Sequence, residues 1–262
     1  MQYHPHLAAP HRAVARQRGV ALFIVIVFVM LSMLLALWAS RTAWFNEMIV
    51  GNDADYQRAF EAAQALLQDA ELDIRGEKSD GSACNAPPCR AYQNDVLQFP
   101  GDTNEINPLI TKLQGEATHC KNGLCARRVG RQDFWNYNDT PGSPAVTPAA
   151  DAALGEEPLS ALQAVGARYG QYTGAQLGSS DKPANPILAD KTDEQGGWYW
   201  IEILRYSDAA QSNNVIVDSS PSQLPLNLDV YVVYRITALA YGRKPGTTVV
   251  LQETYARQRM KD

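Results

Sequence analysis

An uncharged apolar run near the N-terminus constrains this chain more than any other feature. It extends from Val20 to Ser40 (VALFIVIVFVMLSMLLALWAS) and contains no charged residue. A helix needs about 20 apolar residues to cross the hydrocarbon core of a bilayer, and this run is long enough. Three arginines and no acidic residue precede it, and Arg41 closes it. Because arginine-rich flanks stay in the cytoplasm, we expect the rest of the chain to face outward.

A glycine marks the start of the apolar run. Gly19 follows the basic sequence RQR, at a point where a leader could be cut off before Val20 and leave the run on the mature protein. An ordinary secretory signal has a shorter apolar region, of about 7–15 residues, and a small-x-small cleavage site after it. Here the run is longer and the sequence LWA at 37–39 is a poor site, which disfavours such a signal. The sequence therefore predicts a cytoplasmic leader at 1–19 and a transmembrane helix at 20–40.

Helical character is predicted to continue beyond the membrane. The segment 41–74 has no proline and one glycine, Gly51. Its apolar residues recur at helical spacing and form one stripe, while charged residues occupy the other faces. The residues of this stripe are Ala59, Ala63, Leu66, Leu67, Ala70 and Ile74. We expect this amphipathic helix to pack against a globular head formed by residues 75–262.

Four cysteines lie beyond the membrane run, in two pairs of equal spacing, CNAPPC at 84–89 and CKNGLC at 120–125. In an oxidising compartment, an even number of cysteines indicates disulfides. Each pair encloses four residues that include Pro or Gly, so the chain can turn back on itself. This favours the bonds Cys84–Cys89 and Cys120–Cys125, although crossed pairings stay open. A four-cysteine zinc site is the alternative, and the expected compartment disfavours it.

The middle of the chain, 76–197, is predicted to be rich in loops, since ten of the fifteen prolines fall there. Short strands are expected at Val96–Phe99 and Leu124–Val129, and a short helix at Pro158–Tyr169. The stretch Asn138–Ala153 has the composition of a linker.

The C-terminal part, about 198–257, is predicted to form an antiparallel sheet. The sequence predicts three strands, at Trp198–Tyr206, Leu228–Tyr241 and Thr247–Tyr255, with a turn at 242–246 between the last two. The apolar stripe of the long helix is expected to pack on one face of this sheet. Alternate residues of the second strand are apolar and share one face, namely Leu228, Val230, Val232, Tyr234, Ile236, Ala238 and Ala240. The aromatic cluster WYW at 198–200 is expected to place one ring in the core and others at the surface. The fold class is therefore α+β, a long N-terminal helix packed on a C-terminal antiparallel sheet, with a loop-rich, disulfide-bearing middle region.

Charge argues against nucleic acid as the main partner. The formal net charge is −5, and loss of 1–19 with its three arginines would make it −8. A local basic group is the exception, but no aromatic stacking pattern accompanies it, so a solvated loop is expected there. Its members are Lys121, Arg127, Arg128 and Arg131.

No catalytic residue is expected in this chain. His119 is the single histidine beyond the leader, and it lies next to Cys120. A Cys–His pair needs a free thiolate that the imidazole can approach, which adjacent residues rarely achieve. Phosphate-binding glycine loops, nucleophile elbows and zinc-protease motifs are absent from the sequence.

No cofactor or metal ligand set is expected either. Asn52, Asp53 and Asp55 lack the further ligands of a calcium loop and are predicted to form a solvated helix face. The acidic loop with Asp190, Asp193 and Glu194 leaves a calcium site open as the less favoured alternative.

These features together resemble a type IV pilin, and in particular the PilX family of minor pilins. The stretches that carry the resemblance are RQRGVALFIVIVFVMLSMLLAL, GNDADYQRAFEAAQALLQDAE, YRITALAYG and TTVVLQETY. They lie within 16–73 and 198–255, and the CKNGLC loop is also similar to loops of that family.

The resemblance implies how the chain is processed. A prepilin peptidase would cut after Gly19 and N-methylate Val20. The apolar helix would lie first in the inner membrane, with its N-terminus in the cytoplasm, and then in the core of a pilus at the cell surface. Positions along that helix expected to serve in the membrane and in filament packing are Val20, Ile24, Phe28, Leu31, Leu35 and Ala39.

The resemblance also implies a structural role and partners. Minor pilins of this family are not enzymes, and they prime pilus assembly and hence twitching motility. Their partners are other minor pilins and a large PilY-type tip protein, with which they sit at or near the pilus tip.

Ile24 departs from the general pilin pattern. Most pilins carry a glutamate at the fifth mature residue, and a carboxylate in a lipid-facing helix is costly unless it finds a partner. A subunit without it cannot pair with the N-terminal amine of a subunit above, which suits a place at the top of the filament. The K-type minor pseudopilin of type II secretion also lacks this glutamate and is the nearest alternative, although the C-terminal hairpin favours the pilus protein. A membrane-anchored periplasmic enzyme or sensor is the alternative from another class.

Overall fold

The computed structural model describes residues 18–128, 132–136, 157–192, 194–206, 228 and 230–258. These residues belong to two compact units, Met1–Gly51 and Asn52–Asp262. Most of the expected leader and the linker-like stretch Asn138–Ala153 lie outside the described residues.

Helix α1 (Arg18–Arg75) is the first element and contains 58 residues. Its sequence has no proline, and the helix continues through Gly51 without interruption. It ends where the chain folds back, since the amide of Glu77 donates to the carbonyl of Leu72 at 2.9 Å. The predicted continuation of the apolar helix to residue 74 is therefore confirmed.

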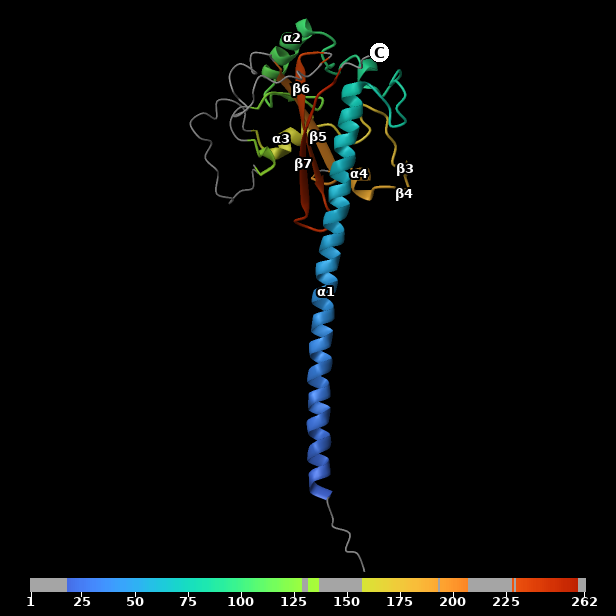
Figure 1. Cartoon of the computed structure of the whole chain (residues 1–262), viewed down its shortest axis with the longest axis vertical. Coiled ribbons are helices and arrows are strands. Elements are labelled where there is room, and N and C mark those ends of the chain that lie inside the picture. The colour runs from blue at the N-terminus through green and yellow to red at the C-terminus, as the bar shows by residue number, and fades with distance from the viewer. Residues whose placement is uncertain are drawn as a thin grey trace, which may run out of the picture. The chain divides into compact units, whose positions relative to one another are not determined.

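The second unit is built on a five-stranded sheet with the order β1-β2-β5-β6-β7, of which β5, β6 and β7 are labelled in Figure 1. The strands are β1 (Cys120–Lys121), β2 (Leu124–Ala126), β5 (Gly197–Arg205), β6 (Val232–Tyr241) and β7 (Thr248–Tyr255). β5, β6 and β7 pair antiparallel, as the alternation of their residues predicts. The hairpin β1–β2 was not predicted as part of this sheet, and β2 joins it by pairing parallel to β5.

Short elements connect these strands. The helices are α2 (Thr103–Gln114), α3 (Leu159–Val165) and α4 (Pro186–Ala189), with 3-10 turns at Arg90–Tyr92 and Phe134–Asn136. A separate ribbon is formed by β3 (Gly178–Ser179) and β4 (Lys182–Pro183).

Helix α2 was missed, although its sequence carries signals of a helix. Asp102 caps its N-terminus by accepting from the amides of Asn104 and Glu105. Three apolar residues recur at helical spacing and are buried, namely Ile106, Leu109 and Leu113. Pro108 lies in the first two turns of the helix, and its position obscured this pattern.

Two other local predictions need correction. Val96–Phe99 does not form a strand. The backbone amide of Leu97 donates to the side chain of Asn122 at 3.3 Å and not to a neighbouring strand. The helix expected at Pro158–Tyr169 is shorter, since α3 ends before Gly166. A side chain at Gly166 would meet the Trp200 indole, with the added Cβ 2.8 Å from Nε1. The strand predicted at Leu124–Val129 exists as β2, and Val129 lies outside the described residues.

The sheet is covered on both faces. One face packs on the apolar stripe of α1, where small residues such as Ala59, Ala63 and Ala70 are fully buried and let the helix approach closely. Residues of β6 on this face are Val232, Tyr234, Ile236, Ala238 and Ala240, as predicted.

The opposite face carries a second cluster. Trp198, Trp200 and Leu239 pack there against Leu162 of α3 and Phe134. Tyr199 lies on the α1 face. All three aromatic rings at 198–200 are therefore buried, and the expectation that some lie at the surface is wrong, because neither face of the sheet is open there.

Candidate functional site

The apolar part of α1 is an exposed hydrophobic surface. Its large apolar side chains between Val20 and Trp38 expose from 37% to 71% of their area. The described residues contain one helix that is long and apolar enough to span a membrane, and this is its apolar part. Ser32 and Thr42 donate their hydroxyls to the carbonyls of Phe28 and Trp38, at 2.8 and 3.0 Å. Their polar atoms are thus paired without water, as a lipid environment requires.

The predicted processing and packing positions lie at the start and along one side of this helix. α1 begins at Arg18, so Gly19 and Val20 lie in its first turn. The six packing positions follow one another at intervals of three or four residues and are all exposed, at Val20, Ile24, Phe28, Leu31, Leu35 and Ala39. Cleavage after Gly19 and methylation of Val20 remain predictions.

Three aspartates of the second unit are buried on α1. Asp55, Asp69 and Asp73 expose only 2%, 1% and 4% of their area. Asp55 and Asp69 accept hydrogen bonds from loops that are distant in the sequence. Asp73 accepts from Arg90, 17 residues further along, and from Tyr199 of β5. Each aspartate thus ties the helix to a different part of the head. Sequence reasoning did not identify them, because a carboxylate in a helix is most often solvated.

Asp55 holds the turn between β6 and β7. Its carboxylate accepts from the amides of Arg243 and Lys244 at 2.9 and 3.0 Å. Burial alone raises its pKa, but these amides and the Thr247 hydroxyl outweigh burial, and the pKa is lowered. Gly242 is required at this contact, since an added Cβ would overlap Oδ2 of Asp55 at 2.3 Å.

The prediction that Asn52, Asp53 and Asp55 form a solvated helix face is therefore wrong at Asp55. Asp53 is exposed as predicted, and Asn52 accepts from the ammonium group of Lys244 at 3.0 Å.

Asp69 holds the loop that follows α3. It accepts from the amide of Gly170 at 2.7 Å and from the hydroxyl of Thr173. Burial raises its pKa to about 6, against the effect of these two hydrogen bonds and with help from the nearby charge of Asp73.

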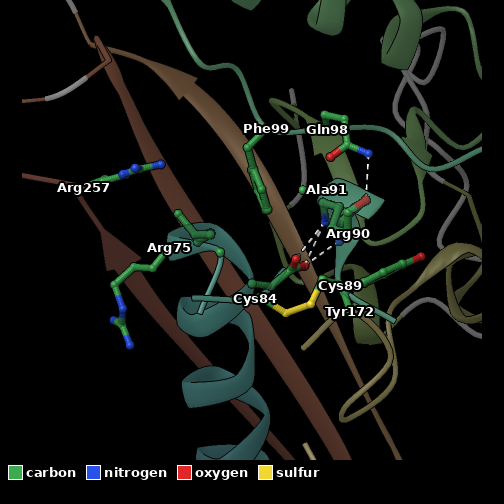
Figure 2. Close-up of a pocket in the computed structure, with 12 residues that line it drawn as sticks. Arg75, Cys84, Cys89, Arg90, Ala91, Gln98, Phe99, Tyr172 and Arg257 are labelled. Atoms are coloured by element: carbon green, nitrogen blue, oxygen red, sulfur yellow. Dashed lines mark hydrogen bonds and ion pairs between the residues drawn. A yellow bond between two sulfur atoms is a disulfide. The ribbon is translucent and has the colours of Figure 1, made fainter. Parts of the chain in front are cut away.

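Asp73 forms a buried ion pair with Arg90. Figure 2 shows Arg90 with its ion-pair and hydrogen-bond contacts as dashed lines. Nε of Arg90 lies 2.9 and 3.0 Å from the two carboxylate oxygens, and Tyr199 donates its hydroxyl to Asp73 at 3.3 Å. The other guanidinium nitrogens donate to the carbonyls of Leu97 and Asn122, both at 3.0 Å. Burial opposes the charge of Arg90, but Asp73 outweighs it, and the pKa of Arg90 is raised.

Aromatic rings complete the surroundings of this ion pair. The guanidinium carbon of Arg90 lies 3.9 Å from the ring centre of Tyr172 and 5.0 Å from that of Phe99. The adjoining cavity measures about 160 Å³. The donors of Arg90 and the carboxylate of Asp73 are occupied by the protein itself, which indicates a structural role for this pair.

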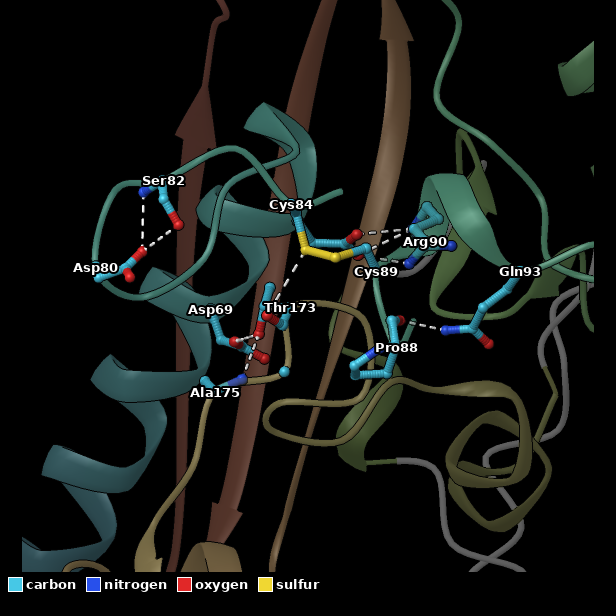
Figure 3. The surroundings of a disulfide bond; sticks show 12 residues. Asp69, Asp80, Ser82, Cys84, Pro88, Cys89, Arg90, Gln93, Thr173 and Ala175 are labelled. Carbon is cyan, nitrogen blue, oxygen red and sulfur yellow. Dashed lines mark hydrogen bonds and ion pairs between the residues drawn. A yellow bond between two sulfur atoms is a disulfide. The ribbon is translucent and has the colours of Figure 1, made fainter. Parts of the chain in front are cut away.

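The first disulfide lies directly beside the ion pair. Cys84 and Cys89 are bonded, and Cys89 immediately precedes Arg90 (Figure 3). The chain after α1 folds back, with the amide of Cys84 donating to the carbonyl of Gly76 at 2.8 Å. The disulfide thus closes the loop that positions Arg90 over the end of α1.

The second disulfide, Cys120–Cys125, closes the β1–β2 hairpin, in which these two residues are cross-strand partners. His119 precedes it with a positive φ of 52°, and its carbonyl accepts from the amide of Ala126 at 2.9 Å. Since Cys120 is bonded to Cys125, it offers no thiolate to this histidine.

The acidic loop near residue 190 surrounds an arginine. Arg168 donates to the carbonyls of Gln195 and Asp190 at 2.8 and 3.4 Å, and it lies 3.6 Å from the ring centre of Trp198. Asp193 lies outside the described residues. In the ranges that the structure describes, no group of three or more His, Cys, Asp or Glu side chains could hold a metal ion.

The basic group separates in the structure. Lys121 pairs with Glu116 at 2.7 Å, and Arg131 lies outside the described residues. Arg127 is exposed, whereas Arg128 is half-buried with its guanidinium 4.3 Å from the ring centre of Phe134. The prediction of a solvated loop is therefore wrong at Arg128.

Comparison with known proteins agrees with this architecture. A family model described as type IV pilus assembly protein PilX, C-terminal, matches residues 121–257. The matched region begins in β1 and extends just past the end of β7, and it includes the part of the middle region from 121 to 197. Among curated proteins and among solved structures, no significant match to the chain was found. Since the family match covers just over half of the 262 residues, the chain belongs to the PilX family of type IV pilus assembly proteins, which are structural pilins associated with pilus assembly.

Proposed function

We propose that this chain is a minor pilin that helps to prime type IV pilus assembly. The observation that carries the proposal is α1, in which an exposed apolar helix continues into the helix that the head buries. A pilin subunit needs an apolar helix of this kind at its N-terminus, first in the membrane and then among the helices of other subunits, followed by a head that packs on the continuation of that helix.

In this proposal, the precursor is inserted in the inner membrane with 1–19 in the cytoplasm. The prepilin peptidase cuts after Gly19 and methylates Val20. The arginines before the run support this orientation, and the exposed apolar side chains support membrane retention before assembly. The same side chains then pack against helices of other subunits when the subunit enters the pilus.

The position proposed for the subunit is at or near the pilus tip, with other minor pilins and a PilY-type tip protein. Support comes from Ile24, which leaves the fifth mature position without a carboxylate. A subunit above would find no acidic partner here for its N-terminal amine, so the filament is expected to grow below this subunit and not above it.

Deletion of the gene tests the priming role. Surface pili and twitching motility should fall strongly, and the wild-type gene supplied in trans should restore both. Unchanged piliation in the deletion strain would refute a priming role. The level of the major pilin in the membrane is the control, since priming defects should leave it intact.

Immunogold labelling of sheared pili tests the tip position separately. An epitope tag after Asp262 should be found at filament ends. Regular labelling along the shaft would refute the tip position and leave the assignment as a pilin untouched.

A further inference from the structure

A cationic cavity lies where β5 ends. It has a volume of about 540 Å³, and four arginines line it, Arg127, Arg128, Arg205 and Arg235. The rest of its described lining is aliphatic or carries amide groups, with no acidic side chain among it. On a chain with a formal net charge of −5, this is a local reversal of sign.

The sheet topology gathers these arginines from distant parts of the sequence. β2 pairs parallel to β5, with Ala126 beside Ile203, so the chain that leaves β2 runs along the end of β5. Arg127 and Arg205 are thereby brought to the same cavity. Arg235 enters from β6, where it is the cross-strand partner of Glu202.

One carboxylate is already bound at this wall. Glu202 is 4% exposed and is held by both Nε and Nη2 of Arg235, each at 2.7 Å. The backbone amide of Arg128 also donates to Glu202, at 2.8 Å. This ion pair neutralises the charge of Arg235, and Arg127 and Arg205 are the exposed cationic groups of the lining.

Two of the arginines have guanidinium groups available for a ligand. Arg127 and Arg205 are exposed, and within the described residues neither side chain makes a hydrogen bond or an ion pair. Each guanidinium carries five N–H donors in a planar fork that matches a carboxylate.

We propose that this cavity binds an acidic segment of a partner protein, with carboxylates of the partner paired to Arg127 and Arg205. The apolar part of such a segment would rest on Ile110 and Leu204, which also line the cavity. A cavity of this size takes several side chains, and among the described residues that line it there is no aromatic ring on which a nucleotide base would stack.

Charge complementarity explains why an acidic partner would bind at this cavity and not elsewhere on the chain. An acidic partner is repelled by most of an acidic chain and attracted to the cavity, which orients the two proteins. The inference rests on the proposed function in one respect, since the partner would be another component of the pilus.

Binding of fluorescein-labelled decaglutamate to the full chain in an uncharged detergent tests the proposal by fluorescence anisotropy. The peptide should bind, and added NaCl should weaken the binding. The variant R127Q/R205Q should bind it roughly tenfold more weakly, because two charge-assisted contacts are lost. The single variants should fall between this variant and the wild type.

The matched control is R58Q/K182Q, which removes two exposed positive charges of the same unit away from the cavity. Its affinity should change by less than roughly twofold, as expected for distant screened charges. Equal losses in both double variants would show a non-specific charge effect and overturn the proposal, as would the absence of peptide binding to the wild type.

Two further probes distinguish other ligands. Displacement of the peptide by inorganic phosphate, but not by NaCl of equal ionic strength, would reassign the cavity to a free anion. Tighter binding of a labelled decanucleotide with the same arginine dependence would reassign it to nucleic acid. Leader cleavage and filament assembly play no part in this assay. A failure of peptide binding would therefore leave the pilin proposal standing, and a failure of the pilin proposal would leave peptide binding to the cavity unaffected.

Discussion

The two parts of helix α1 have the same backbone and opposite surroundings. From Val20 to Trp38 the large side chains are apolar and exposed, whereas from Asp55 onward the helix buries an alanine-rich stripe and three aspartates. The first part is apolar on every side, and the second on one side only. Secondary structure alone therefore does not set the role of a helix. The distribution of polar and apolar side chains around it decides whether it contacts lipid, other helices or its own head.

The buried aspartates explain how the second part is fixed. An alanine stripe permits close packing but specifies little about position along the helix axis. Asp55, Asp69 and Asp73 lie at three successive positions along the helix, and each accepts hydrogen bonds from a different part of the head. We infer that these bonds set the register between α1 and the head.

The largest effect expected in the buried part of α1 comes from breaking the Asp73–Arg90 pair. D73A leaves the buried guanidinium without its counter-charge and should lower the free energy of unfolding of the head by about 3–5 kcal/mol. Urea unfolding of the full chain in detergent, followed by tryptophan fluorescence, measures this loss. D53A is the matched control on the same helix, where an exposed carboxylate is removed and a change within about 0.5 kcal/mol is expected. Similar values for the two variants would contradict the assignment of the pair.

The next effect concerns pH and Asp69. Its pKa is raised to about 6 in the folded head, so the folded state holds this proton more tightly than the unfolded chain, whose Asp pKa is about 3.9. Rising pH from about 4 to about 6 should therefore lower stability, by about 2–3 kcal/mol for a shift of this size, and the loss should be complete above that window.

D69N removes this contribution, because an amide does not titrate. The difference in unfolding free energy between wild type and D69N should vary across pH 4–6 and be constant above pH 7. The comparison is made between variants because Glu253, whose pKa burial and Glu71 raise to about 7, changes stability in the same direction. A pH-independent difference would refute the raised pKa.

Enlarging one alanine in each part of α1 tests the comparison directly. A63L overfills the contact with the sheet and should destabilise the head by about 2 kcal/mol. A36L adds the same atoms to an exposed position of the apolar part and should leave head unfolding unchanged. Equal destabilisation by the two substitutions would break the distinction between the two parts.

The smallest effect is expected at Asp55. D55A leaves the amides of Arg243 and Lys244 without their acceptor and should cost about 1 kcal/mol, whereas D55N keeps an acceptor oxygen and should cost less. Amide hydrogen exchange of the β6–β7 turn measures the effect locally. Unchanged protection in D55A would show that the carboxylate does not hold the turn.

Features that depend on local pattern could be predicted from the sequence. The long helix, the three strands β5 to β7 and the disulfide-bearing loops follow from periodicity, turn residues and short spacing between cysteines. Helix α2 also had a local signal in Asp102 and Glu105, and Pro108 obscured it.

Features that depend on contacts between distant segments could not be predicted. The parallel pairing of β2 with β5 joins residues far apart in the chain, and without it Arg127 and Arg205 would not share a cavity. Asp55 was read as solvated because its partners are backbone amides near residue 243, and every residue except proline offers such an amide. The burial of all three rings at 198–200 likewise depends on α3 and Phe134 covering the second face of the sheet.

The central claim is that the exposed part of α1 begins a mature pilin subunit and is not a permanent anchor. Mass spectrometry of the protein isolated from sheared pili, after proteolysis and peptide sequencing, tests it most directly. The expected result is an N-terminal peptide that starts with N-methylated Val20. An intact leader, or a chain that starts beyond Ser40, would contradict it.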